Sequence, residues 1–202
     1  MVRSIRAVTG IWDKSRPTEG NHTVFLEFED GTAATAVYNG YDHFHTTELT
    51  FDIGEGGPLT KSTTYAQARR MIKETKSQTD EVALKVASGY GGERSKNYKE
   101  SEKHHPFFGL TVVSCEKGDI RQHPEGLIVY GEYEKYVVPI SKEKTGRYNV
   151  IDELYKAVVE EEPSVHDGRW AKANLEICIK AIQSSKERKE LYLNHQVPVK
   201  KR

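Results

Sequence analysis

Alternation of apolar and polar residues dominates the first fifty positions of the chain. Val2–Trp12, His22–Glu29 and Thr32–Tyr38 each alternate with the period of a half-buried β-strand. Asp30-Gly31 lies between the last two segments as a two-residue turn, and this arrangement predicts a β-hairpin. Glu48–Ile53 continues the alternation, so we expect it to extend the sheet.

The middle of the chain changes to a helical pattern and then returns to strands. Apolar residues among Lys and Arg predict helices over Thr64–Gln78 and Asp80–Ala87. Gly89–His105 holds little that can be buried and predicts a mobile surface loop. Strand signals return in three segments separated by glycine-containing turns: Phe108–Cys115, Leu127–Tyr130 and Tyr136–Ile140.

Two predicted helices, Val150–Glu162 and Gly168–Ser185, come before a short strand at Leu191 and Leu193. Asp167 is placed to cap the start of the second helix. One apolar face of that helix recurs at helical spacing and consists of Ala171, Leu175, Cys178, Ile179 and Ile182. The order of elements predicts an α+β fold, an open, largely antiparallel β-sheet with helices on one face, in a single domain over residues 1–202.

Charge and cysteine content exclude some classes of protein. The 202 residues include 30 Lys and Arg against 30 Asp and Glu, and this balance argues against a dedicated nucleic-acid binder, which is usually basic. Cys115 and Cys178 are the only cysteines, and their spacing to the histidines suggests no zinc site. Without a secretory signal or a long apolar run, we expect a cytoplasmic protein with reduced thiols.

The motifs of a self-contained enzyme are missing from the sequence. A dinucleotide-binding turn needs glycines between a strand and a helix, but Gly54, Gly56 and Gly57 are followed by Pro58 and favour an ordinary turn. The sequence also has no P-loop, no nucleophile elbow and no His-Glu-x-x-His. We therefore expect no cofactor to be held by this chain alone.

Seven segments lie in the order seen in one family of oxidoreductases. They are Arg16–Gly20, Phe28–Gly31, Tyr38–Phe44, Phe108–Glu116, Gly118–Gln122, His166–Trp170 and His195–Pro198. Together they resemble the carboxy-terminal domain of the glucose-fructose oxidoreductase, inositol dehydrogenase and rhizopine-catabolism family, and within it the phthalate dihydrodiol dehydrogenases. The resemblance runs from Val2 to Val199.

The resemblance implies that this chain corresponds to only one of the two domains of an enzyme. Members have an amino-terminal Rossmann domain for NAD or NADP and a carboxy-terminal open sheet that lines the substrate site and packs against another subunit. The catalytic Lys-Pro motif belongs to the Rossmann half, and the catalytic Asp and His precede the position of Val2. The resemblance therefore assigns no catalytic residue here.

The expected function follows from this division of parts. We expect a substrate-binding and oligomerisation domain of an NAD(P)-dependent dehydrogenase, forming a homo-oligomer through its open sheet face and not catalytic alone. The resemblance implies a carboxylated aromatic cis-dihydrodiol as substrate, although members of the family differ in substrate. A second hypothesis is a stand-alone binding or scaffold protein that keeps the fold, in which case Met1 is a true start and not the start of a fragment.

Three candidate binding residues follow the predicted hairpin. Tyr41, His43 and His45 lie just after a strand, where loops commonly carry binding groups, and a phenol or imidazole can hydrogen-bond a substrate hydroxyl. If the strand continues, His43 and His45 project to the same side. The alternative is an ordinary polar strand end.

A second group of candidates suits an anion. Arg169 and Trp170 open the last helix, where backbone amides and a guanidinium can receive a carboxylate or phosphate. The alternative is that Trp170 packs in the core and Arg169 pairs with an acid. Arg16, in a proline-containing loop, is a weaker candidate of the same kind.

The third and least supported hypothesis is an independent hydrolase or metal enzyme built on the histidines, with His104, His105 and His123 as the candidate metal ligands. Adjacent histidines in a charged loop seldom reach one ion together, and no Cys or acid completes a recognisable ligand set. We expect no metal.

Overall fold

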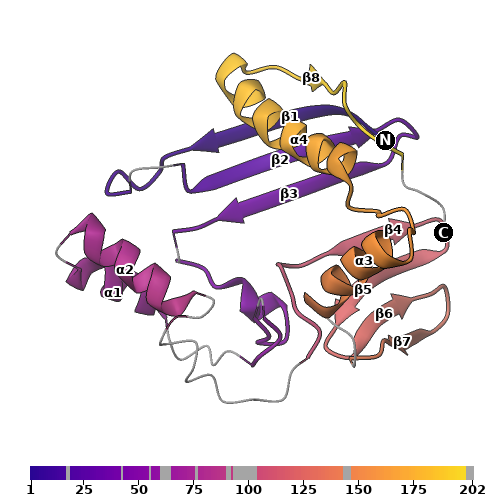
Figure 1. Cartoon of the computed structure of the whole chain (residues 1–202), viewed down its shortest axis with the longest axis horizontal. Coiled ribbons are helices and arrows are strands. Elements are labelled where there is room, and N and C mark those ends of the chain that lie inside the picture. Colours follow the sequence, from indigo (N-terminus) through magenta and orange to yellow (C-terminus); the bar gives the residue numbers. More distant parts are fainter. Residues whose placement is uncertain are drawn as a thin grey trace. The chain divides into compact units, whose positions relative to one another are not determined.

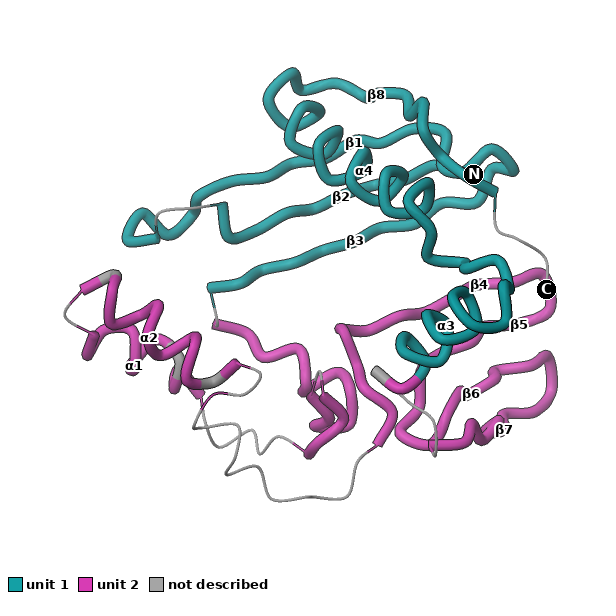
Figure 2. Tube along the Cα trace, viewed as in Figure 1, with its two compact units in different colours: residues 1–41, 149–202 teal, residues 42–148 magenta. Residues whose placement is uncertain are grey.

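A computed structural model of the chain describes residues 1–16, 19–41, 43–54, 56–59, 65–75, 77–89, 92, 104–142 and 147–198. By their contacts the residues fall into two compact units, Met1–Tyr41 with Asn149–Arg202, and Asp42–Tyr148 (Figure 2). Each unit contains one antiparallel four-stranded sheet, and four α-helices accompany the two sheets in the described part (Figure 1). The predicted α+β fold is confirmed.

The sheet of the first unit has the strand order β3-β2-β1-β8. Its strands are β1 (Val2–Gly10), β2 (Asn21–Phe28), β3 (Ala33–Asn39) and β8 (Leu191–Tyr192). The predicted hairpin is confirmed, because β2 pairs antiparallel with β3 from Asn21↔Asn39 to Glu27↔Ala33. Gly31 in the turn has a φ of +84°, a conformation that glycine adopts without strain.

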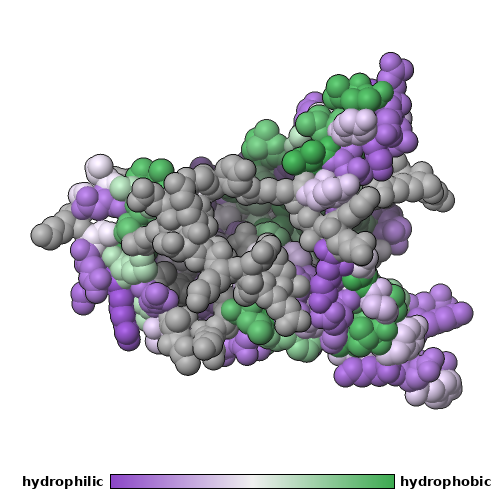
Figure 3. Space-filling model, turned by 60° about the horizontal axis from the view of Figure 1, so that its bottom comes forward, coloured by the Kyte–Doolittle hydropathy of each residue, from purple (hydrophilic) through white to green (hydrophobic). Residues whose placement is uncertain are grey.

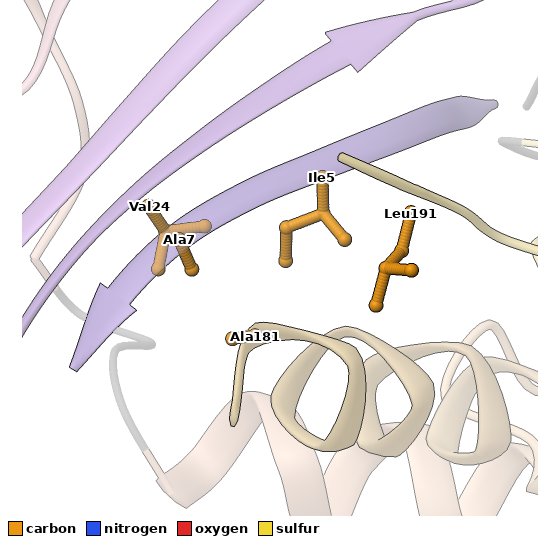
Figure 4. Packing of buried hydrophobic residues seen from close by; sticks show 5 residues of the cluster. All are labelled: Ile5, Ala7, Val24, Ala181 and Leu191. Atoms are coloured by element: carbon orange, nitrogen blue, oxygen red, sulfur yellow. The ribbon is translucent and has the colours of Figure 1, made fainter. Parts of the chain in front are cut away.

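Helix α4 (Gly168–Glu187) covers one face of this sheet. Ile5, Ala7 and Val24 from the strands meet Ala181 of α4 and Leu191 of β8 (Figure 4). The hydroxyls of Ser184 and Ser185 accept the backbone N–H groups of Ala7 at 3.0 Å and Thr9 at 2.9 Å. β8 pairs with β1 only at Ser4 and Ile5. The N–H groups of Ala7 and Thr9 lie beyond that pairing, and the two serine hydroxyls of α4 accept them instead.

The buried side of α4 is not the apolar face that the sequence indicates. Leu175, Ile179 and Ile182 are 59 %, 55 % and 42 % exposed, whereas Ala173, Glu176, Ala181 and Ser184 are buried. Small side chains allow the helix to approach the sheet closely, and Ser184 adds hydrogen bonds that an aliphatic residue lacks. Apolar side chains of α4 consequently reach the surface. Figure 3 shows hydrophobic patches, in green, on one side of the molecule.

The sheet of the second unit has the order β4-β5-β6-β7. Its strands are β4 (Val112–Cys115), β5 (Gly118–His123), β6 (Gly126–Tyr130) and β7 (Lys135–Pro139). The sequence did not indicate β5, because charged and polar residues surround its one aliphatic side chain, Ile120. Pairing on both edges makes it a strand nonetheless.

The segment before the helices of this unit differs from the prediction. Glu48–Ile53 is not a strand, because a 3₁₀ helix, η1 (Thr46–Leu49), and a turn occupy it. The buried Thr50 hydroxyl donates to the Ile53 carbonyl at 3.1 Å, and Phe51 and Asp52 adopt positive φ. Local hydroxyl and backbone bonds here replace sheet pairing, which apolar alternation alone does not reveal.

Three further helices complete the described part, namely α1 (Gln67–Glu74), α2 (Gln78–Ser88) and α3 (Arg147–Val159). The predicted helix over Thr64–Gln78 is therefore shorter, and Ser77 instead caps α2 by accepting the N–H of Asp80. Most of the predicted loop Gly89–His105 lies outside the described residues. No helix in the described ranges is long and apolar enough to cross a membrane.

Candidate functional site

Tyr41 lies at the end of the β2–β3 hairpin with its ring buried. Its hydroxyl accepts the backbone N–H of Trp12 at 2.8 Å and donates to the Gly10 carbonyl at 3.2 Å. Burial raises the pKa of this hydroxyl, but the Trp12 N–H and neighbouring donors outweigh burial and hold the pKa below its ordinary value. The Tyr41 hydroxyl thus ties the end of β1 to the hairpin.

His43 and His45 lie in the loop that follows, and both are exposed. β3 ends at Asn39, so the premise that the two imidazoles project from a continuing strand is wrong. Nδ1 of His45 is hydrogen-bonded to the hydroxyl of Thr47 in η1. Nδ1 of His43 instead lies 2.9 Å from Nη1 of Arg69, a residue of α1.

Arg69 is a residue that sequence reasoning missed. Its guanidinium carbon lies 5.2 Å from the centroid of the Tyr65 ring, within cation–π range. His43 and Arg69 are 26 positions apart in the chain, so no local motif links them. The only sequence signal was an arginine in a short amphipathic helix, which is typical of many solvated helices.

Arg169 and Trp170 lie at the start of α4, as predicted. The Asp167 carboxylate accepts the backbone N–H groups of both residues, at 3.0 Å and 2.9 Å, and so confirms the predicted cap. These two amides are therefore engaged within the chain. Trp170 is 41 % exposed and contacts the His166 ring edge-on at 4.6 Å, so it does not pack in the core.

A single carboxylate orders the loop before α4. Glu153 of α3 accepts the N–H groups of Val165 and His166, each at 2.8 Å, and the Ser164 hydroxyl at 2.6 Å. Its second oxygen lies 2.7 Å from Nδ1 of His166. The His166 N–H, then the Ser164 hydroxyl and the His166 side chain lower the pKa of Glu153 to about 2. Glu153 thereby fixes the imidazole against which Trp170 packs.

Arg16 lies in the loop after β1, where its backbone N–H donates to the Asp13 carbonyl at 3.1 Å. Arg16 and Tyr41, like Arg169 and Trp170, belong to the first unit, whereas His43 and His45 belong to the second. The contact between His43 and Arg69 lies wholly within the second unit.

The three histidines of the metal hypothesis make separate contacts. His104 approaches Glu125, His105 donates through Nε2 to the Ile140 carbonyl, and Nδ1 of His123 accepts the Glu125 N–H. Among the described residues, no three His, Cys, Asp or Glu side chains are grouped so as to hold a metal ion.

The glycine-rich segment near residue 54 is a closed turn and does not fit a dinucleotide. Gly54 donates its N–H to the Pro58 carbonyl, and Gly57 donates to the Gly54 carbonyl, both at 3.0 Å. Gly57 has a φ of +88°, and a Cβ there would lie 2.3 Å from the His104 carbonyl oxygen. The N–H groups of Gly54 and Gly57 thus serve the closure of this turn, and no helix begins within the described residues 56–59.

No protein-family model matches the chain. The sequence is 30 % identical over 186 residues to the 1-carboxy-3-chloro-3,4-dihydroxycyclohexa-1,5-diene dehydrogenase of Comamonas testosteroni, covering 92 % of this chain and 47 % of that protein. A crystal structure from Bordetella bronchiseptica RB50, described as that of a dehydrogenase, superposes with a TM-score of 0.83 at 36 % identity. The homologues of this chain are dehydrogenases.

More distant structures share the fold alone. An oxidoreductase of Agrobacterium radiobacter, solved with NAD⁺, L-tartaric acid and magnesium, has a TM-score of 0.53 at 11 % identity over 95 % of this chain. The match to the Bordetella protein covers 95 % of this chain and 49 % of that one. This chain therefore spans about half the length of the dehydrogenases that it matches.

Proposed function

We propose that this chain is the substrate-binding and subunit-assembly half of an NAD(P)-dependent dehydrogenase of the glucose-fructose oxidoreductase, inositol dehydrogenase and rhizopine-catabolism family. The observation that carries the proposal is the extent of similarity, which covers 92 % of this chain but only 47 % of the Comamonas dehydrogenase. The partner that completes the enzyme in this proposal is a Rossmann half that binds NAD or NADP, and the 47 % coverage of the Comamonas dehydrogenase supports such a missing half.

The substrate class follows from the same relative. The name of that dehydrogenase describes a ring that bears one carboxylate and two hydroxyls. We propose a carboxylated cyclic diol for this protein also. In this assignment the chain supplies groups that bind and orient the diol, while NAD or NADP would supply the acceptor for hydride.

The loop after β3 supplies the leading binding groups. His43 and His45 are exposed there, and each imidazole is oriented by a neighbour, Arg69 or Thr47. A neutral imidazole held in one tautomer by a contact at Nδ1 can make one hydrogen bond to a polar group of the substrate through Nε2. Arg16, Tyr41, Arg169 and Trp170 are secondary candidates, and the hydroxyl of Tyr41 already serves Trp12 and Gly10.

The open face of the first sheet supports assembly into a homo-oligomer. α4 covers the face that carries Ile5, so the opposite face presents Val8, Phe25 and Val37, which are 51 %, 47 % and 71 % exposed. Adjacent exposed apolar side chains on a sheet mark protein contacts more often than scattered ones do. A C₂ dimer through this face would bury these three residues on both subunits.

The test uses the complete enzyme. The full reading frame is expressed, and formation of reduced nicotinamide is followed with a carboxylated cyclohexadiene cis-diol and NAD or NADP. We expect turnover with one of the two cofactors and none from the 202-residue chain alone. His43→Ala should lower kcat/KM by about tenfold, equivalent to one lost hydrogen bond.

His22→Ala is the matched control, because the His22 ring stacks on Tyr38 in the first unit at 5.5 Å and has no proposed binding role. Equal kinetics for the His43→Ala enzyme and the parent would remove His43 from the site. A reading frame that encodes no Rossmann half would favour the stand-alone binding or scaffold protein.

A further inference from the structure

Two neighbours hold the guanidinium of Arg69 in place. Nη1 lies 2.9 Å from Nδ1 of His43, and the Tyr65 ring lies 5.2 Å from the guanidinium carbon. Arg69 is partly buried, and its neighbours Tyr65, 62 % exposed, and His43 are exposed, so solvent reaches part of the group. An arginine fixed in this way loses less side-chain entropy when it binds a ligand than a freely moving one.

The contact between Arg69 and His43 also determines the tautomer of the imidazole. A guanidinium only donates, so Nδ1 of His43 must accept, and the ring proton of the neutral imidazole lies on Nε2. The pair therefore offers donors alone to a ligand, the Nε2–H of His43 and the remaining N–H groups of Arg69. Groups that only donate suit a ligand that only accepts.

The positive charge of Arg69 has no acidic partner among the described residues. Its Nε is buried and makes no hydrogen bond to them. Arg3, by contrast, pairs with Glu27 at 3.2 Å. A buried donor without a partner costs free energy, which the contacts among the described residues do not offset.

We propose that Arg69, with His43 and Tyr65, binds the carboxylate of the substrate. The planar fork of a guanidinium matches the two oxygens of a carboxylate, and an aromatic ring on its face leaves the edge N–H groups available. The assignment of this carboxylate to a substrate rests on the proposed function and names the group that would anchor the ring of the cyclic diol.

Benzoate titrated into the 202-residue chain is the test, followed by nuclear magnetic resonance of the arginine side-chain Nε–H groups. Benzoate should shift the Arg69 signal, and Arg69→Gln should weaken binding by about tenfold or more. Arg69→Lys keeps the charge without the fork and should bind with intermediate affinity. Arg70→Gln is the matched control, since Arg70 is exposed on the same helix, and it should bind as the parent does.

Two other probes identify the chemistry. Benzamide, which has the same ring without the charge, should not shift Arg69. Inorganic phosphate should bind more weakly than benzoate, and tighter binding of phosphate would overturn the carboxylate assignment in favour of a phosphate site. Equal affinity for benzoate in Arg69→Gln and Arg70→Gln, with the backbone spectrum intact, would overturn the site itself.

The carboxylate site and the proposed function can each fail without the other. If the complete enzyme oxidises the diol and Arg69→Gln leaves KM unchanged, the carboxylate site fails while the function stands. If benzoate binds at Arg69 but the complete protein oxidises no diol with either cofactor, the anion site stands and the function fails.

Discussion

The hydroxyl of Ser184 accepts the backbone N–H of Ala7 at 3.0 Å, which joins α4 to β1 inside the core of the first unit. The same hydroxyl donates to the Lys189 carbonyl at 2.6 Å, and Ser184 is 0 % exposed. Ser184→Ala removes the hydrogen-bond partner of the Ala7 N–H and of the Lys189 carbonyl. We expect a loss of about 1–3 kcal/mol in the free energy of unfolding for each group left without a partner, measured by urea denaturation.

The neighbouring serine is the comparison for that prediction. Ser185 accepts the Thr9 N–H at 2.9 Å at a partly buried position. Water can replace the lost partner there, so Ser185→Ala should cost clearly less. Equal losses for the two variants would contradict the role assigned to Ser184.

Glu176 ties the carboxy-terminal segment to α4. Its buried carboxylate accepts the N–H groups of Asn194 at 2.7 Å and His195 at 2.8 Å, and Nε2 of Gln196 at 3.0 Å. Glu176→Gln replaces one carboxylate oxygen, which accepts, with an amide NH₂ group, which donates. That group would face the N–H donors of the carboxy-terminal segment. We expect a loss of about 1–3 kcal/mol in unfolding free energy and faster amide hydrogen exchange at His195.

Glu160→Gln, at an exposed position near the end of α3, is the control and should change neither quantity. Unaltered exchange at His195 in the Glu176→Gln protein would show that the carboxylate does not hold this segment.

Acid should weaken the loop that Glu153 orders. The His166 N–H and its companions lower the pKa of Glu153 from 4.5 to about 2. A carboxyl with a lower pKa in the folded state stabilises the fold above its unfolded pKa, and that stability is lost as pH falls through the folded pKa. The contribution is therefore complete above about pH 4.5 and declines toward about pH 2.

The measurement is unfolding free energy from about pH 7 to about pH 2 for the parent and for Glu153→Gln. The variant should be less stable at neutral pH, and its difference from the parent should shrink across the acid range. Glu134→Gln, at an exposed position in the β6–β7 turn, should follow the parent curve. A constant difference at every pH would contradict this account of Glu153.

Charge on the open face of the first sheet should prevent assembly. Light scattering at micromolar concentration should show a dimer or larger species for the protein, and Phe25→Lys should give a monomer with an unchanged circular dichroism spectrum. Tyr133→Lys, at a 91 % exposed turn position, should leave the assembly intact. A monomeric parent protein would count against the proposed interface.

Structural features that depend on residues close together in the chain could be predicted from the sequence. The β2–β3 hairpin and the Asp167 cap of α4 both follow from residues within a few positions of each other. The strand expected over Glu48–Ile53 failed because Thr50 satisfies nearby carbonyls. Alternation of apolar and polar residues does not distinguish a strand from a 3₁₀ helix followed by a turn.

Long-range packing determined the rest. α4 packs with Ala181 and Ser184 because small side chains fit against β1, although Leu175 and Ile179 form the more apolar stripe. The pairing of His43 with Arg69 likewise joins a loop to a helix that is distant in sequence. A single sequence contains no spacing rule for either contact.

The central claim is that this chain is one half of a nicotinamide-dependent dehydrogenase. Sequencing the source DNA upstream of the Met1 codon tests it most directly. The account predicts an in-frame extension that encodes a strand, a Gly-x-Gly-x-x-Gly turn, a helix and a Lys-Pro motif. An in-frame stop codon with no dinucleotide-binding half encoded beside it would contradict the account.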